Sequence, residues 1–356
     1  MLDFTRSDMG HLIHHYVGNK GLGGPLDLSL AETNLQDDLT KTQLMNFLTQ
    51  NFKSDIVYEF RKKDPDQVSL YSVQDYCQRL FYNKNQESFS SFSRSIAEHL
   101  YNQTMHPKIP GGTMYLAYFQ DVVSDGIMVD AIGIFKKEED EQFLKPEIKE
   151  GYAVIESDYG QSIDKLEKGV IILNTAENDG YKIHVFDKGK KVKDIAFYWL
   201  EDFLSIKLKD TPYYQTSHQI MQILSFCDEV LTTENNVAIM DKKMVENKTI
   251  NFFTAREKFN PEEFNKDVLL GQAELVSSYK DHKESYQKNY QMTLKDDFDI
   301  SQTAVKEKSK YASTTIHLDK NFEVKIKSRY DLMDQGFDEE KGLKYIKLWY
   351  ANDEFK

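Results

Sequence analysis

Two groups of basic residues have the types and spacing best suited to chemistry, and that chemistry is the binding of phosphate groups. One group lies in residues 303–329, where seven basic and three acidic side chains give a local net charge of +4. The other follows an expected strand at residues 181–187. Lysine neutralises phosphates without reading bases, so both groups predict contact with a nucleic-acid backbone. The candidate DNA-binding residues are Lys306, Lys308, Lys310, Lys325, Lys327 and Arg329 in the first group, and Lys188, Lys190 and Lys191 in the second.

Simpler interpretations of both groups stay open. Lysines on an outer strand face also protect a sheet edge from pairing with other chains, and the second group is equally typical of a lysine-rich turn. Arginine, on which bidentate guanine readout relies, occurs only six times in the chain. Any direct DNA contact is therefore expected to be weak, sensitive to salt and without base specificity.

A metal-dependent nuclease is the enzymatic alternative. Such enzymes place an acid on one strand and a Glu-x-Lys triplet on the next, so that carboxylates hold Mg²⁺ while the lysine assists the water. Asp130 and the triplet Glu147-Ile148-Lys149 fit that pattern. In a chain with 29% charged residues such triplets arise by chance, and Glu147 follows Pro146 in an expected loop. We therefore predict a protein that is not an enzyme, with no catalytic residues, and keep the nuclease as a remote alternative.

Other residues that often do chemistry lack the context for it here. His11, His14 and His15 have no partner pair such as His-Glu-x-x-His, so they are interpreted as ordinary surface or packing residues. The two cysteines lie 150 positions apart, without metal spacing. The glycines of residues 18–24 match neither a phosphate loop nor a dinucleotide loop and predict a flexible connection. No metal and no cofactor is expected.

The elements that must position the lysines begin with a mixed α and β region. A strand is expected at 11–17 and helices at 29–51, 72–82 and 89–105. Short segments rich in β-branched and aromatic residues follow, separated by turns, and predict an antiparallel meander. These strands are expected at 113–119, 129–135, 151–156, 170–175 and 181–187, with a charged, solvated helix or loop at 136–149.

The second half of the chain has a mainly helical pattern. Helices are expected at 196–206 and 217–231, from Asn260-Pro261 to about 290, and from Ser301 to 311. A hairpin at 314–318 and 322–327 and a last strand at 344–350 close the chain. The fold class is therefore α+β: a mixed N-terminal domain with an antiparallel meander plus helices, residues 1–240, and a smaller helical C-terminal domain ending in a β-hairpin, residues 241–356.

The charge balance excludes a compact basic protein that coats DNA with its whole surface. The 356 residues include 45 Lys+Arg and 58 Asp+Glu, a net charge of −13, of which −11 belongs to residues 1–250. A hydrophobic content of 40% suits a large core. No signal peptide and no apolar run long enough to span a bilayer are evident, so a cytoplasmic protein without membrane contact is expected.

An ordered series of short blocks resembles the NdpA/YejK-type bacterial nucleoid-associated protein family. The blocks run from about residue 11 to 350, in family order. They include His15–Lys20 (HYVGNK), Ser95–Tyr101 (SIAEHLY), Asp130–Lys136 (DAIGIFK), Lys165–Gly169 (KLEKG), Leu318–Phe322 (LDKNF) and Gly342–Tyr345 (GLKY). Similar sequences tend to read Ile-His-Gly where this chain has Ile326-Lys-Ser-Arg329, which makes the basic hairpin partly particular to this chain.

The resemblance implies co-localisation with the bacterial nucleoid, DNA association and links to type II topoisomerases, and it brings no active site. The leading hypothesis is a non-enzymatic protein that associates with non-specific double-stranded DNA, directly through its lysines or through a DNA-processing protein. The alternative is an acidic adaptor or modulator that binds a topoisomerase or another DNA enzyme without touching DNA. A homodimer is a further option that the sequence leaves open.

Overall fold

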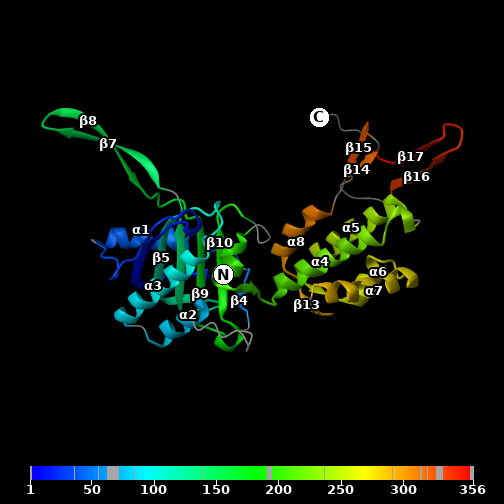
Figure 1. Cartoon of the computed structure of the whole chain (residues 1–356). Coiled ribbons are helices and arrows are strands. Elements are labelled where there is room, and N and C mark those ends of the chain that lie inside the picture. The colour runs from blue at the N-terminus through cyan, green and yellow to red at the C-terminus, as the bar shows by residue number, and fades with distance from the viewer. Residues whose placement is uncertain are drawn as a thin grey trace. The chain divides into compact units, whose positions relative to one another are not determined.

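The computed structural model describes residues 2–35, 37–54, 56–61, 72–83, 85–138, 140–190, 195–235, 237–290, 292–312, 315–318, 320–325 and 332–352. It is a mixed α+β structure with antiparallel sheets, which confirms the predicted fold class. Two compact units form, residues 1–209 and 210–356, and each is described by itself (Figure 1). The division into functional domains at residues 240 and 241 stays a prediction.

An antiparallel sheet forms the centre of the first unit. Four of its strands, β5, β6, β9 and β10, are neighbours in the order in which the chain makes them, as the predicted meander requires. The strands run in the order β11-β4-β10-β9-β6-β5-β2-β3, with β1 beside β5. Their bounds are β1 Leu2–Asp3, β2 Asp8–Val17, β3 Leu26–Asp27, β4 Tyr58–Phe60, β5 Gly112–Ser124, β6 Ile127–Lys137, β9 Lys168–Leu173, β10 Lys182–Asp187 and β11 Ile206–Leu208.

Helices cover both faces of this sheet because its strands are apolar on both sides (Figure 1). Helix α1 (Asp38–Thr49) buries Phe47 and Leu48 in a core with Phe119, Phe135 and Ile171. Helices α2 (Val73–Tyr82) and α3 (Gln86–Asn102) lie on the opposite face. The side chain of Asp37 accepts a hydrogen bond from the Thr40 N–H, so α1 begins there and is shorter than the helix expected over 29–51.

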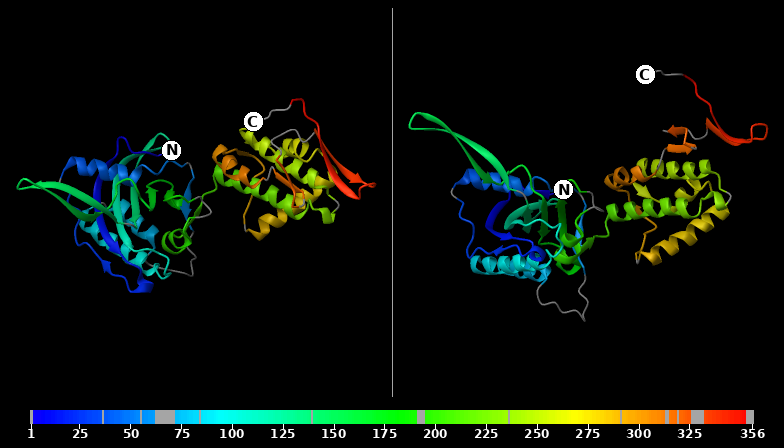
Figure 2. Two further views of the ribbon diagram at one scale, coloured as in Figure 1. Left: turned by 90° about the horizontal axis from the view of Figure 1, so that it is seen from above. Right: turned by 45° about the horizontal axis from the view of Figure 1, so that its top comes forward.

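The charged segment 136–149 is not the solvated helix or loop that its composition suggests. Lys136 and Lys137 end β6, and β7 (Glu141–Lys149) pairs with β8 (Tyr152–Gly160) in a hairpin that leaves the sheet (Figures 1 and 2). Glu150 and Gly151 join the strands with φ of 53° and 85°. Two residues with positive φ make the tight turn whose twist matches antiparallel strands. The two strands therefore pair through this turn, although neither strand has a buried face.

The predicted helix at 196–206 is a π-helix, η4 (Tyr198–Leu204), that buries Trp199, Phe203 and Leu204. The glycines of residues 18–24 form a closely packed loop, so the prediction of a flexible connection was wrong. A Cβ on Gly21 would lie 2.1 Å from the Met105 carbonyl oxygen. The Asn19 side chain donates to the carbonyls of His106, at 2.9 Å, and Ile109, at 2.7 Å, which fixes the loop against the end of α3.

The second unit is a helical bundle with two hairpins. Its aromatic core includes Phe253, Phe259 and Phe264. A smaller cluster around Met240 packs against both hairpins. The helices are α4 Pro212–Glu229, α5 Ile239–Thr254, α6 Pro261–Asp267, α7 Ala273–Asn289 and α8 Gln302–Lys308; the paired strands are β12 Lys258–Phe259 with β13 Phe298–Asp299, β14 Thr315–Leu318 with β15 Phe322–Lys325, and β16 Met333–Asp338 with β17 Leu343–Leu348. The hairpin predicted near 314–327 is confirmed within the described residues, whereas β16 was not expected.

None of the helices within the described ranges combines the length and apolar composition that a membrane crossing requires.

His15 makes the stability of the first unit depend on pH. Its Nδ1 accepts from the Ser29 backbone N–H at 3.0 Å, so its Nε2 carries the proton toward Ser93 Oγ, 3.1 Å away. Burial, with smaller effects of His14 and Arg94, lowers the pKa of His15 to about 4. The unfolded chain takes up a proton below about pH 6.5 that folded His15 does not take up until about pH 4. Stability is therefore lost across that window, by up to about 3 kcal/mol.

Urea unfolding of the whole chain at several pH values between 7 and 5 measures this loss. His15→Gln is expected to flatten the pH dependence of the unfolding free energy by about 2 kcal/mol over that range. Burial also lowers the pKa of His184 to about 4, so some dependence remains in the variant. An unchanged slope in His15→Gln would show that His15 is not a source of the effect.

Candidate nucleic-acid interface

Helix α8 directs its lysines away from the core of the second unit. Ser301 caps the helix by accepting from the Ala304 N–H at 3.3 Å. Ala304 and Val305 are buried, which leaves Lys306 exposed on the outer side. The helix period therefore places Lys306 on the solvent face, whereas Lys308 is half-buried.

Tyr311 brings two of the predicted lysines together. The Nζ atoms of Lys308 and Lys310 lie 5.9 Å and 5.3 Å from the centroid of its ring. Tyr311 itself is 37% exposed, Lys310 is exposed and Lys308 is half-buried. Each such contact contributes about 0.5–1 kcal/mol at an exposed site. Sequence reasoning missed Tyr311, although its position directly after Lys310 was a visible signal.

The only acid of residues 302–311 is fixed on the inner side of this group. Glu307 accepts a hydrogen bond from the Tyr213 hydroxyl of α4 at 2.7 Å. Burial lowers the pKa of His218 to about 4, and the Lys308 ammonium acts in the same direction. His218 is therefore neutral near pH 7 and adds no positive charge beside Lys308. Residues 302–311 themselves carry a net charge of +2.

Strand β15 supplies the next predicted residue. Val324 packs against the cluster around Met240, so its neighbour Lys325 points outward and is exposed. This agrees with the expected alternation on the hairpin. Lys327 and Arg329 lie outside the described residues, and so does Lys191 of the second group.

The second predicted group has a different setting, in the first unit. Lys188 and Lys190 are both exposed in the turn after β10. Lys188 Nζ lies 3.2 Å from Glu167 Oε1, which compensates its charge. The structure therefore brings Lys308 and Lys310 together at Tyr311 and exposes Lys306 on α8, whereas the Lys188 turn is partly neutralised.

A buried network of lysines and acids adjoins the Lys188 turn. Lys137 Nζ lies 3.3 Å from Glu167 Oε2, and Lys168 Nζ lies 3.0 Å from Asp187 Oδ1. The same Glu167 carboxylate accepts the Glu138 N–H at 3.0 Å. Each of these side chains is at most 10% exposed, and such buried ions persist only when they are paired.

Lys136 is the most enclosed member of this network. It lies opposite Lys168 across the β6–β9 pairing, and its Nζ donates to the Pro110 carbonyl at 2.6 Å. The Tyr198 ring of the π-helix covers it, with Nζ 5.7 Å from the ring centroid. Burial lowers the pKa of Lys136, and Lys168 adds to this, whereas Glu138 opposes it. The expectation that Lys136 belongs to a solvated segment was therefore wrong.

The residues of the nuclease alternative do not come together. Asp130 lies near the start of β6, where it accepts a hydrogen bond from the Tyr118 hydroxyl at 2.7 Å. Glu147 and Lys149 lie in β7, beyond the other end of β6. Seven residues of extended strand separate Asp130 from Lys137, a distance of about 23 Å. Among the described residues, no group of three or more His, Cys, Asp or Glu side chains is arranged to hold a metal ion.

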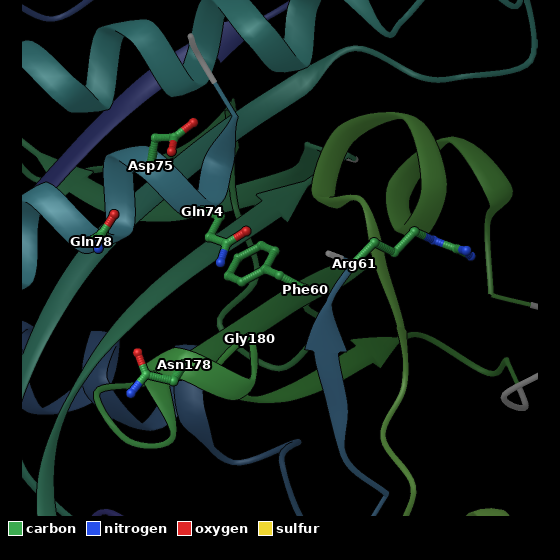
Figure 3. A pocket seen from close by; sticks show the side chains of 7 residues that line it. All are labelled: Phe60, Arg61, Gln74, Asp75, Gln78, Asn178 and Gly180. Atoms are coloured by element: carbon green, nitrogen blue, oxygen red, sulfur yellow. The ribbon is translucent and has the colours of Figure 1, made fainter. Parts of the chain in front are cut away.

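A hollow of about 230 Å³ lies between β4, α2 and the turn before β10 (Figure 3). Its lining residues are Phe60, Arg61, Gln74, Asp75, Gln78, Asn178 and Gly180. The Asp75 carboxylate accepts the N–H of Ser72 as part of the α2 capping box. Figure 3 shows Arg61 turned away from the other side chains, and its Nη2 pairs with Glu201 Oε1 at 2.6 Å. The charged groups here have structural roles, and the lining residues that the structure describes include no Ser, Thr or Cys that could act as a nucleophile.

Comparison with known protein families matches residues 11–341 to the family described as nucleoid-associated protein YejK. The chain belongs to this family. The match spans both compact units, so the YejK-family region includes the α8 lysines, the Lys188 turn and the β7–β8 hairpin alike. A comparison with curated proteins found no match.

Proposed function

We propose that this member of the YejK family is a non-enzymatic protein of the bacterial cytoplasm and nucleoid that associates with double-stranded DNA, weakly and without base specificity. One observation supports this most: Lys306, Lys310 and Lys325 are exposed, Lys308 is half-buried beside Tyr311, and the one acid among residues 302–311 is held on the inner side. Lysines of this kind bind the phosphate backbone, which is common to all sequences.

The charge of the second unit limits this contact to one part of its surface. Residues 210–356 contain 21 basic and 26 acidic side chains, so the unit as a whole is repelled by DNA. Binding must therefore come from the local cluster of ammonium groups. The structure describes four of the candidate lysines in this unit. Of these four, Lys308 and Lys310 lie over an aromatic ring, that of Tyr311.

A salt titration of duplex binding tests the proposal. Four lysine–phosphate contacts predict a slope of log K against log salt concentration between about −3 and −4. Fluorescence anisotropy with two labelled duplexes of unrelated sequence measures both the slope and the absence of base preference. Undetectable binding at low ionic strength, where backbone contacts are strongest, would overturn the proposal.

A second function is favoured by the charge of the first unit. Residues 1–209 contain 24 basic and 32 acidic side chains. Of these, Lys136, Lys137, Lys168, Glu167 and Asp187 are buried, so the acidic excess stays on the surface. Such an acidic surface steers a basic partner, which here is a type II topoisomerase or another DNA enzyme. Affinity purification from nuclease-treated extract distinguishes this adaptor from the DNA binder, because loss of all partners after DNA digestion contradicts it.

A further inference from the structure

The β7–β8 hairpin is an amphipathic ribbon whose apolar face is uncovered. Residues that pair across antiparallel strands point to the same side, and pairs alternate between the two sides. The pairs Leu144–Ser157, Pro146–Ile155 and Ile148–Ala153 therefore share one face, together with Tyr159. Leu144, Ile148, Ile155 and Tyr159 are between 67% and 81% exposed. We call these four side chains the arm face.

The opposite face of the hairpin carries its charged residues, beside Phe143, Val154 and Tyr152, and these charges are paired with one another. Lys145 Nζ lies 3.1 Å from Asp158 Oδ2. Lys149 Nζ lies 2.6 Å from Glu156 Oε1 and 3.3 Å from Glu147 Oε2. These pairs need no partner molecule. The arm face carries no charged side chain, so its exposed apolar groups form the more continuous apolar surface of the hairpin.

The hairpin is held in a defined position at its base, although Figures 1 and 2 show it projecting from the sheet. Gln161 accepts from the Tyr115 hydroxyl at 2.5 Å and donates to Thr113 Oγ1 at 2.7 Å. Lys165 pairs with Glu141 at 2.6 Å. A fixed projection with a flat apolar side is suited to recognition by another surface.

Two classes of partner are disfavoured by charge. Residues 141–160 contain two lysines and five acids, a net charge of −3, which repels both nucleic acid and anionic lipid. A third mode, addition of a strand to the β7 edge, is obstructed by Pro146. Counted from the tight turn, Pro146 occupies a non-hydrogen-bonded pair, so its missing N–H is one that would have pointed outward.

We propose that the arm face is the site at which two copies of this chain associate, ribbon against ribbon across a two-fold axis. In that arrangement the apolar faces meet, while the acidic faces of both copies point to solvent and do not repel each other across the contact. Four side chains of this size and exposure present roughly 600 Å² of surface. Two stacked arm faces therefore bury roughly 1,200 Å², the lower limit of specific, stable interfaces.

Sedimentation velocity of the full chain over two decades of micromolar concentration tests the proposal. The wild type is expected to sediment as a dimer, and Ile148→Glu/Ile155→Glu as a monomer at every concentration. Tyr152→Glu is the matched control, because Tyr152 is 75% exposed on the charged face of the same hairpin. This variant should dimerise like the wild type. Unchanged circular dichroism and melting temperature in both variants show that the folded units are intact.

Disulfide trapping provides a second readout, which also detects a weak dimer because each association event can be captured covalently. The native Cys77 and Cys227 are buried, so a cysteine introduced on the hairpin is the reactive one. Ala153→Cys, on the side of the arm face, is expected to form a covalent dimer on oxidation, and Tyr152→Cys is not. A wild type that stays monomeric throughout, or an Ile148→Glu/Ile155→Glu variant that stays dimeric, would overturn the proposal.

Discussion

Replacing Lys306, Lys308 and Lys310 together by glutamine is expected to weaken duplex binding about a hundredfold near 50 mM salt. Each lysine–phosphate contact that is lost removes about 0.9 from the slope of log K against log salt concentration. The slope should therefore become shallower by about 3, approaching that of the contact left at Lys325. Because Ala304 and Val305 form the buried side of α8, these substitutions leave its packing intact.

A control with the same loss of charge separates local contact from net charge. Lys266, Lys280 and Lys288 lie on α6 and α7 of the same unit and are exposed. Their triple substitution by glutamine should change the slope by less than about 1. Equal effects of the two triple variants would mean that only the net charge matters, which would contradict a binding surface at α8.

Glu167→Ala is expected to destabilise the first unit by about 3–5 kcal/mol. The carboxylate compensates the buried ammonium of Lys137 and accepts the Glu138 N–H, so its removal leaves a charge and a donor unpaired in the interior. Urea unfolding followed by the fluorescence of Trp199 measures the loss, because this tryptophan is buried in the first unit.

The Glu167 carboxylate also pairs with the exposed Lys188, and substitution of Lys188 is the control for the loss of stability. Lys188 is 44% exposed, so Lys188→Ala should cost less than about 1 kcal/mol. Adding Lys137→Met to Glu167→Ala should recover part of the stability, because it removes the uncompensated charge. A loss in Glu167→Ala no larger than that in Lys188→Ala would rule out an essential ion pair.

The sheet and the bundle were predictable because burial leaves a period in the sequence. In β5 and β6, β-branched and aromatic residues over 113–119 and 129–135 indicated strands. The strand expected over 151–156 is β8, whereas β7 left no such mark, because it is almost wholly exposed and its charges resemble those of a loop. The turn between these two strands has two residues with positive φ, Glu150 and Gly151. Glutamate is uncommon at such a position, so the sequence did not indicate a tight turn there.

The candidate site was only partly predictable, for the same physical reason. Lys306 points outward because the helix period of α8 requires it, and that period is local. The pairing of Lys188 with Glu167 and the burial of Lys136 beside Lys168 depend on register between strands distant in the chain. Long-range register is a property of the folded sheet, and a single sequence does not contain it.

The place where the β7–β8 hairpin joins the sheet affects how this protein can evolve. The chain leaves β6 and returns into β9, and these two strands pair directly with each other from Ala131–Leu173 to Lys136–Lys168. The central sheet is therefore complete without the hairpin. Mutations that lengthen or shorten this hairpin, or change its side chains, leave the core of the sheet unchanged. Natural selection can therefore alter which molecules the hairpin binds while the sheet stays the same.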